Sequence, residues 1–216
     1  MPYTASLNNS LIDHWDGGSA FTQPSTVYLA LYTAASGSDP STWTEVSTSS
    51  TGYARIVVKG DFAAASASAA ASNVANTFVP STASWGTVVA ATYISSSSGA
   101  GTIYGWFRLG DGDYHTAVAL TTGVFYSAAH GFSDDDIIVF DPIFGESLPG
   151  GVTSGTAYYV ISSATNNYSI STSQGGAAVT ISSAGECQAQ IYDPQTVNAA
   201  NQNITFSSGT LTISHG

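Results

Sequence analysis

The chain has 216 residues, of which 43% are hydrophobic and 12% aromatic, so it can bury a substantial core and is not expected to be disordered. Only 8% of its residues are charged, and three basic residues, Arg55, Lys59 and Arg108, leave a formal net charge of −11. Three cations cannot form the basic stripe that phosphate contacts require, so we expect no direct nucleic-acid partner, and anionic membranes should repel the chain for the same reason.

Targeting signals are not recognisable in the sequence. The N-terminal stretch MPYTASLNNSLIDHW lacks the basic and apolar regions of a signal peptide, and no apolar run reaches the roughly 18–20 residues of a membrane span. We therefore expect a protein that is made in a cytoplasm and stays soluble or assembles there.

The N-terminal residues predict one short amphipathic helix. Gly17 and Gly18 supply a left-handed stop at its end, and its apolar stripe consists of Leu7, Leu11, Ile12 and Trp15. A lone amphipathic helix is marginally stable in water, so the stripe must dock on something. These four residues are therefore candidates for a subunit interface.

From Thr26 onward the sequence predicts β-structure. The alanine-rich stretch 62–76 is interrupted by serines and has no large apolar stripe, so we expect it to be extended rather than helical. Strands are expected at 26–33, 53–60, 83–95, 101–110 and, as two short strands, within 202–216. This pattern predicts an all-β fold with a β-sandwich or jelly-roll body and one short N-terminal helix.

The middle third predicts a separate small all-β module. It contains short alternating strands, with a Thr-Asn-Asn turn at 165–167 that reverses the chain. The flanking stretches LGDGDYH and IYDPQ are rich in turn residues, as expected at an insertion point. The predicted organisation is a discontinuous body, residues 1–112 and 194–216, and an inserted module, residues 113–193.

The stretch YSAAHGFSDDDIIVF, residues 126–140, is open to three interpretations. Its aspartates, Asp134, Asp135 and Asp136, could bind Ca²⁺, but they lack the order of an EF-hand. His130 could act as an acid or base, but no nucleophile is recognisable nearby. We favour a plain turn in which Ser133 and Asp134 cap the backbone ahead of a strand at 137–140.

Nothing else in the sequence indicates catalysis. Cys187 is the only cysteine, and its strand-like context predicts a small buried residue rather than a nucleophile. There is no G-x-S-x-G elbow, and the acids that glycoside hydrolysis would need, Glu45, Glu146 and Glu186, are scattered. We expect no enzymatic activity, no metal and no cofactor.

Arg55 and the tryptophans are the remaining candidates for structural contacts. Arg55 follows Tyr53 in a predicted strand, and we expect it to form a bidentate pair with a carboxylate in the interior or at an interface. We place Trp85 and Trp106 in the core, while Trp43, in a polar loop, is the interface candidate. The complete set of interface candidates is Leu7, Leu11, Ile12, Trp15, Trp43, Tyr53 and Arg55.

The outer segments resemble a family of small virion proteins of tailed bacteriophages, which are labelled as capsid decoration or tail fibre proteins. The matching text, in family order, is SLIDHW, TVYLALYTA, TEVSTSSTGYARIVV, SWGTVVAATYI, YGWF and VNAANQNITFSSGTLTIS. The inserted stretch resembles a second phage-associated module through AAHGFSDDDIIVF, SLPGGVTSGTAYYVIS and NYSISTSQGGAAVTISSAG. Its Phe132 and Asp134-Asp135 depart from the commoner leucine and glycine-aspartate text.

The two resemblances together imply a virion structural protein. Our expectation is a capsid decoration (cement) protein on the outer surface of the phage head. It would bind the major capsid protein as a homotrimer and stabilise the lattice by multivalent packing. The alternative is a tail-associated or fibre protein whose inserted module contacts the host surface or glycans. A rival of another class, a polysaccharide depolymerase, would need acids clustered in a groove.

Overall fold

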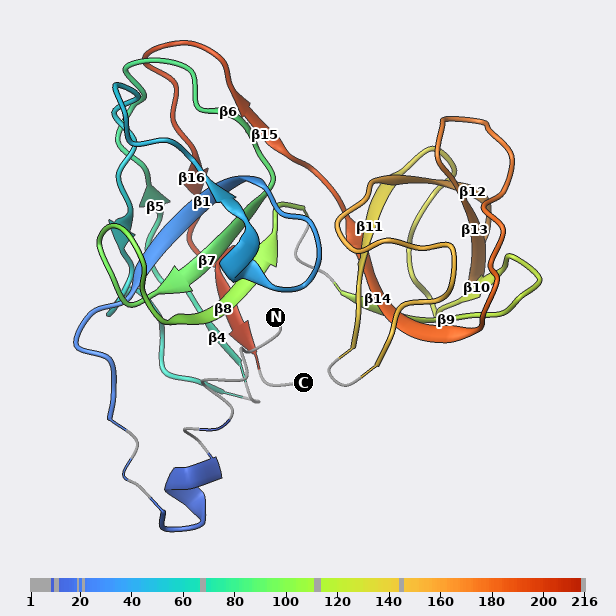
Figure 1. Cartoon of the computed structure of the whole chain (residues 1–216), viewed down its shortest axis with the longest axis horizontal. Helices are drawn as coiled ribbons and strands as arrows, with labels where there is room; N and C mark the ends of the chain where they lie inside the picture. The colour runs from blue at the N-terminus through green and yellow to red at the C-terminus, as the bar shows by residue number, and fades with distance from the viewer. Residues whose placement is uncertain are drawn as a thin grey trace. The chain divides into compact units, whose positions relative to one another are not determined.

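The computed structural model describes residues 9, 12–18, 20, 22–66, 69–110, 114–143 and 146–214, without the side chains of 212–214 (Figure 1). The all-β class is confirmed, with one short helix near the N-terminus. Residues 12–15 are helical, and Gly17 ends the turn with a φ of 83°, as predicted. Leu7 and Leu11, half of the expected stripe, lie outside the described residues.

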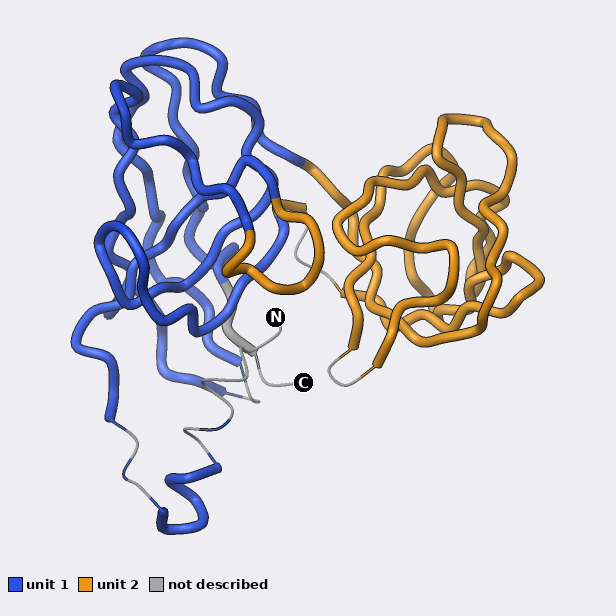
Figure 2. The backbone as a smooth tube through the Cα atoms, in the orientation of Figure 1, with its two compact units in different colours: residues 1–34, 43–108, 194–216 blue, residues 35–42, 109–193 orange. Residues whose placement is uncertain are grey.

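The chain divides into two compact units, which Figure 2 colours separately. Unit 1 comprises residues 1–34, 43–108 and 194–216, and unit 2 comprises residues 35–42 and 109–193. A short 3₁₀ turn, Pro40–Thr42, lies in the first segment of unit 2. Unit 2 therefore consists mainly of one continuous stretch of chain that interrupts unit 1.

The sandwich or jelly-roll body that we expected takes the form, in unit 1, of one five-stranded antiparallel sheet and three two-stranded sheets. The residues Leu29, Ala30 and Leu31 in the central strand β1 are fully buried, so the sheet is covered on both faces. The five strands are β1 (Tyr28–Ala34), β2 (Thr44–Glu45), β3 (Ile56–Val57), β7 (Ala90–Ile94) and β8 (Ile103–Arg108). The path runs β2-β1-β7-β8, with β3 also pairing β1, and the predicted hairpin across the serine-rich turn is β7–β8.

The C-terminal segment of unit 1 completes it by pairing three times with an earlier stretch. Successive strands of the C-terminal segment pair with successively earlier strands of the other stretch, so the two stretches run antiparallel along their length (Figure 1). They are β15 (Gln195–Val197) with β6 (Gly86–Val88), β16 (Thr205–Phe206) with β5 (Asn76–Thr77), and β17 (Thr212–Ser214) with β4 (Ala69–Ala71). The alanine-rich stretch is extended, as predicted.

Unit 2 is a closed six-stranded barrel in which every strand pairs on both sides. Closure leaves no sheet edge, which protects the unit against edge-to-edge association. Side chains alternate between the interior and the outside, so in β9 Ala117 and Ala119 are buried while Thr116 and Val118 are exposed. In order around the barrel the strands are β10 (Phe125–Tyr126), β13 (Asn167–Ser171), β12 (Tyr158–Ala164), β11 (Ile137–Asp141), β14 (Gly185–Ile191) and β9 (His115–Ala119).

An aromatic cluster fills the barrel. The Phe125 ring stacks on Phe140 at a centroid distance of 5.0 Å and on Tyr168 at 5.4 Å. All three side chains are fully buried, and aliphatic and small residues from the other strands complete the core. Stacked aromatic pairs add about 0.5–1.5 kcal/mol beyond their buried area. Unit 2 therefore has a hydrophobic core of its own.

The two ends of the long segment of unit 2, residues 109–193, lie against each other. The Asp193 N–H donates to the carbonyl of Leu109 at 3.0 Å. At Gly110 the approach is so close that an added Cβ would lie 1.8 Å from the carbonyl oxygen of Ile191. Only glycine fits where the chain enters the barrel.

We predict that Gly110→Ala destabilises the protein by at least several kcal/mol or prevents folding, because the new methyl group collides with backbone that cannot move away cheaply. Thermal and urea unfolding of the full chain measures this. The control is Gly175→Ala, where φ is +62° and no atom lies within 4 Å. That variant should lose only about 1 kcal/mol. Equal losses in the two variants would contradict the steric explanation.

Candidate functional site

A bidentate ion pair joins Glu45 on β2 to Arg55, which precedes β3. Arg55 Nε donates to Glu45 Oε1 at 2.8 Å, and Nη2 donates to Oε2 at 2.6 Å. The guanidinium also donates to the carbonyls of Ser96 and Gly99, each at 2.8 Å, in the β7–β8 turn. The Arg55 side chain is only 4% exposed, and its hydrogen bonds to Glu45 raise its pKa. The expected pairing of Arg55 with a carboxylate is confirmed.

Tyr53 extends this network into the core. Its hydroxyl donates to Glu45 Oε1 at 3.0 Å and accepts the N–H of Leu31 on β1 at 2.8 Å. Burial raises the pKa of Tyr53 well above its usual range. The Tyr53 ring stacks on Phe78 and meets Trp85 edge-on at 5.6 Å. The Glu45 carboxylate thus accepts hydrogen bonds from both Tyr53 and Arg55, which are two residues apart in the sequence.

Two interface candidates prove to be core residues. Tyr53 is 4% exposed and Trp43 is 8% exposed, so neither presents its ring at the surface of the chain. Placing Trp43 at an interface is therefore corrected: its ring contacts Tyr32 and Trp106 edge-on, at 5.7 and 5.1 Å. The residues next to Trp43 in the sequence are polar, which suggested exposure. The residues that bury its ring are distant in sequence, so the local pattern could not reveal them.

Arg108 makes cation–π contacts that the sequence did not predict. Its guanidinium lies 5.3 Å from the ring centre of Trp43 and 5.5 Å from that of Trp106, and the residue is only 2% exposed. Cation–π attraction offsets part of the cost of burying this charge. Trp106 is 4% exposed and Trp85 5%, so the prediction that both are core residues is confirmed. Of the expected helical stripe, Ile12 and Trp15 are exposed, at 59% and 89%.

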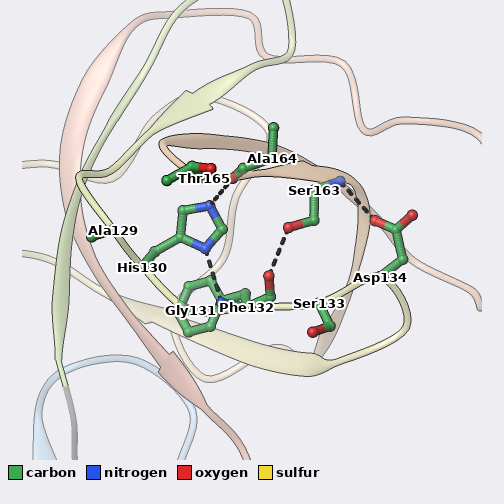
Figure 3. Close-up of a pocket in the computed structure, with 9 residues that line it drawn as sticks. All are labelled: Ala129, His130, Gly131, Phe132, Ser133, Asp134, Ser163, Ala164 and Thr165. Atoms are coloured by element: carbon green, nitrogen blue, oxygen red, sulfur yellow. Dashed lines mark hydrogen bonds between the residues drawn. The ribbon is translucent and has the colours of Figure 1, made fainter.

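The stretch containing His130 is a turn, as predicted, with an ordered interior. The Phe132 N–H donates to His130 Nδ1 at 3.0 Å, so Nε2 carries the proton that it donates to the Ala164 carbonyl at 2.8 Å (Figure 3). Both ring nitrogens are therefore occupied, and the ring is 2% exposed. A histidine with both nitrogens bonded to backbone holds two segments together and has no nitrogen left for a reacting proton.

The backbone hydrogen bonds of this turn are made by a different aspartate from the one predicted. Asp136, not Asp134, caps the turn: its carboxylate accepts the Ser133 N–H at 2.7 Å. Asp134 reaches across to β12, where Oδ1 accepts the Ser163 N–H at 2.7 Å (Figure 3). The Ser163 hydroxyl returns a bond to the Phe132 carbonyl at 2.7 Å. These bonds tie the loop before β11 to the end of β12.

A pocket of about 610 Å³ opens where these segments meet. The buried rings of His130 and Phe132 form its interior, and exposed residues form its rim. Figure 3 shows the nine residues of the lining: Ala129, His130, Gly131, Phe132, Ser133, Asp134, Ser163, Ala164 and Thr165. The hollow is wide open to solvent, so it would enclose a ligand only in part.

Backbone strain concentrates around this pocket. Ala129, Asp135 and Ser162 have φ values of 48°, 72° and 54°, in the left-handed region that non-glycine residues rarely adopt. Each such residue costs of order 1 kcal/mol or more and persists only where the surrounding contacts fix it. The hydrogen bonds of His130 and Ser163 supply those contacts.

Metal ligation and nucleophilic catalysis find little support in the part of the chain that the structure describes. Within it, no three or more His, Cys, Asp or Glu side chains gather closely enough to hold a metal ion. Cys187 is fully buried in the barrel wall, and its thiol faces the carbonyl of Ala117 at 3.6 Å. Burial, with a smaller contribution from Glu186, raises the pKa of Cys187 to about 12. Glu45, one of the scattered acids, is committed to Arg55.

A comparison with known families identifies the first half of the chain. The model of the podophage GP4 fiber I protein gp80 family matches residues 2–111, just over half of the sequence. The chain belongs to this family of phage virion proteins. No curated protein sequence matches it significantly. Residues 112–216 lie outside the match, so the resemblance of the inserted stretch to a second phage module stays a prediction.

The fibre I match ends close to where the chain enters unit 2. Leu109 is the first residue of the long segment of that unit, and the matched range stops at residue 111. The match therefore includes the whole Glu45–Tyr53–Arg55 network and the pairing strands of unit 1 up to β8. The pocket lies beyond it. No helix in the described residues of this family member is long and apolar enough to span a membrane.

We predict that Arg55→Met and Glu45→Gln each destabilise the protein by about 3 kcal/mol, because each leaves a largely buried partner uncompensated. In the double variant the losses should not add, and the coupling should be about 1–3 kcal/mol. Urea unfolding of the four proteins measures it. Pairing Lys59→Met with Glu45→Gln is the matched control and should show coupling near zero. Additive losses for Arg55 and Glu45 would exclude a shared network.

We predict that the Cys187 thiol resists alkylation in the native protein at pH 8 and reacts at once in urea. The raised pKa leaves almost no thiolate in the folded state. The same shift favours the folded state below the ordinary thiol pKa, and that stability is lost as the pH rises from about 9 toward 12. Mass spectrometry after iodoacetamide treatment and a pH series of unfolding midpoints measure both effects. Rapid native labelling would contradict the buried position.

Proposed function

We propose that this chain is a fibre component of a podophage-type virion and acts by packing and surface recognition without turnover. The family match over residues 2–111 carries the proposal, because the matching family is described as a fibre protein. Unit 1, which contains most of the matched stretch, would attach the chain to the particle. Unit 2 would be the part available for contact with the host surface.

The charge distribution supports this division of roles. Unit 2 contains ten of the chain's fourteen acidic residues and none of its three basic residues. Unit 1 is almost neutral, which suits close packing against neighbouring subunits, because fewer charges must be desolvated there. Exposed Trp15 and Ile12 in unit 1 remain proposed anchors for that packing.

The absence of an enzymatic role is part of the proposal. The acids that a depolymerase would need are not paired: Glu45 bonds to Arg55, Asp136 caps the turn, and Asp134 has no second acid beside it among the residues that line the pocket. A homotrimer is the assembly we propose, since closed symmetry repeats one modest interface several times. The alternative, decoration of the head with the major capsid protein as partner, follows from the resemblance of the outer segments to proteins with that label.

Copy number and position on the particle test this proposal. We predict a handful of copies per virion, clustered at the tail, by quantitative mass spectrometry of purified particles and by gold labelling of an epitope tag. Hundreds of copies spread over the head would favour decoration instead. Particles that lack the protein, or a purified monomer that cleaves host polysaccharide, would overturn both.

A further inference from the structure

We propose that the pocket beside His130 binds a neutral glycan. The inference rests on the proposed fibre function for its biological setting, and on the pocket itself for its chemistry. Four observations support it: the charge of unit 2, the groups that line the pocket, the fixed backbone around it, and an exposed aromatic ring beside it.

The charge of unit 2 selects the class of ligand. With ten acidic residues and no lysine or arginine, this unit has no cation that could bind a phosphate, a sulfate or a uronate. An anionic ligand would also be repelled by the surrounding carboxylates. Asp134 is the one carboxylate that lines the pocket, and the described part of the chain has no group of three or more His, Cys, Asp or Glu that could hold a metal ion. The charge of unit 2 therefore disfavours anionic ligands, and the hydroxyl groups at the rim of the pocket favour a hydroxyl-rich ligand.

The lining offers what sugar hydroxyls require. Asp134 is exposed, and only its Oδ1 is engaged, by the Ser163 N–H. A carboxylate accepts strong hydrogen bonds from hydroxyl donors, and its second oxygen is available for this purpose. Exposed Ser133 and Thr165 add hydroxyl groups at the rim, which can both donate and accept. Phe132 and His130 lie beneath these groups and are almost fully buried, so they support the pocket floor and offer little surface to a ligand.

The pocket is fixed before any ligand arrives. Left-handed φ values at Ala129 and Asp135 in the loop before β11, and at Ser162 in β12, set the course of both bordering segments. The His130 ring, bonded at both nitrogens, locks the loop against β12. A site with little freedom to lose binds with a smaller entropic penalty.

An exposed aromatic ring lies next to the same turn. Tyr126 is 48% exposed at the end of β10, where it pairs with Asn167 on β13. The adjoining residue Asn166 accepts the Ala129 N–H through its side chain at 3.0 Å. Tyr126 and the pocket therefore flank one β12–β13 turn. Tyr126 does not line the pocket itself, so its amphipathic ring would meet a sugar only where an oligosaccharide extends beyond the pocket toward β10.

Binding of neutral oligosaccharides to the full chain tests the inference. The probes are hexose and deoxyhexose oligosaccharides, with uronate-containing and phosphorylated oligosaccharides for comparison, measured by saturation-transfer NMR and calorimetry. We expect binding of neutral probes alone. Asp134→Asn should weaken it about tenfold or more, since a hydrogen bond to a charged group is lost while the amide oxygen still accepts the Ser163 N–H.

The matched control is Asp135→Asn. It removes the same charge from the neighbouring residue, which does not line the pocket, and asparagine tolerates the left-handed φ of 72° found there. It should leave affinity within twofold. Tyr126→Ala should weaken binding and Tyr126→Phe should retain it. Unfolding midpoints show that each variant is folded.

The possible failures are separable. If no neutral oligosaccharide binds, if acidic probes bind as well, or if Asp134→Asn and Asp135→Asn behave alike, the glycan site is wrong, whatever the position of the protein on the virion. If neutral glycans bind as expected but gold labelling places the protein on the head, the site stands and the fibre function falls.

Discussion

The bidentate pair between Glu45 and Arg55 connects four stretches of unit 1 that are far apart in the sequence. Glu45 is on β2, Arg55 precedes β3, Tyr53 carries the connection to the backbone of β1, and the guanidinium reaches the carbonyls of the β7–β8 turn. A planar fork of donors is needed for this, and lysine could not replace it. Of the three basic residues in the chain, two, Arg55 and Arg108, have largely buried side chains and make contacts inside unit 1. The network thus links β2, the backbone of β1 and the β7–β8 turn.

Unit 2 is built on a different principle. It contains neither lysine nor arginine, so a closed ladder of hydrogen bonds and an aromatic interior hold it together. Its long segment, residues 109–193, begins and ends at adjacent points, beside Gly110 and Asp193. An insertion with this geometry can occupy a loop of a host domain without distorting that domain, because its two ends are already close. Polar contacts are concentrated where the loop before β11 meets β12.

Local patterns in the sequence predicted most of the strands and their turns. β1, β11 and the β7–β8 and β12–β13 hairpins follow from β-branched runs bounded by turn residues, and the end of the helical turn follows from Gly17. Arg55 was predictable as half of an ion pair because cations are so scarce. Its partner was not, since ten residues separate it from Glu45 and only the fold brings them together. Trp43 was misplaced for the same reason. His130 bonds to the carbonyl of Ala164, which lies 34 residues further along the chain, and no local sequence pattern predicts such a contact.

The stepwise pairing of β15, β16 and β17 with β6, β5 and β4 has a consequence for synthesis on the ribosome. Unit 1 cannot close until its final residues have emerged, yet all of unit 2 is translated before them. The insertion can therefore fold while the earlier half of its host waits with unpaired strands, the kind of exposure that favours association with other chains. The paired strands are more than 100 residues apart in the sequence, and contacts between such distant residues form slowly. Strands β15–β17 complete the pairing of unit 1. Because they are translated after the barrel, unit 1 can finish folding only after all of unit 2 has been synthesised.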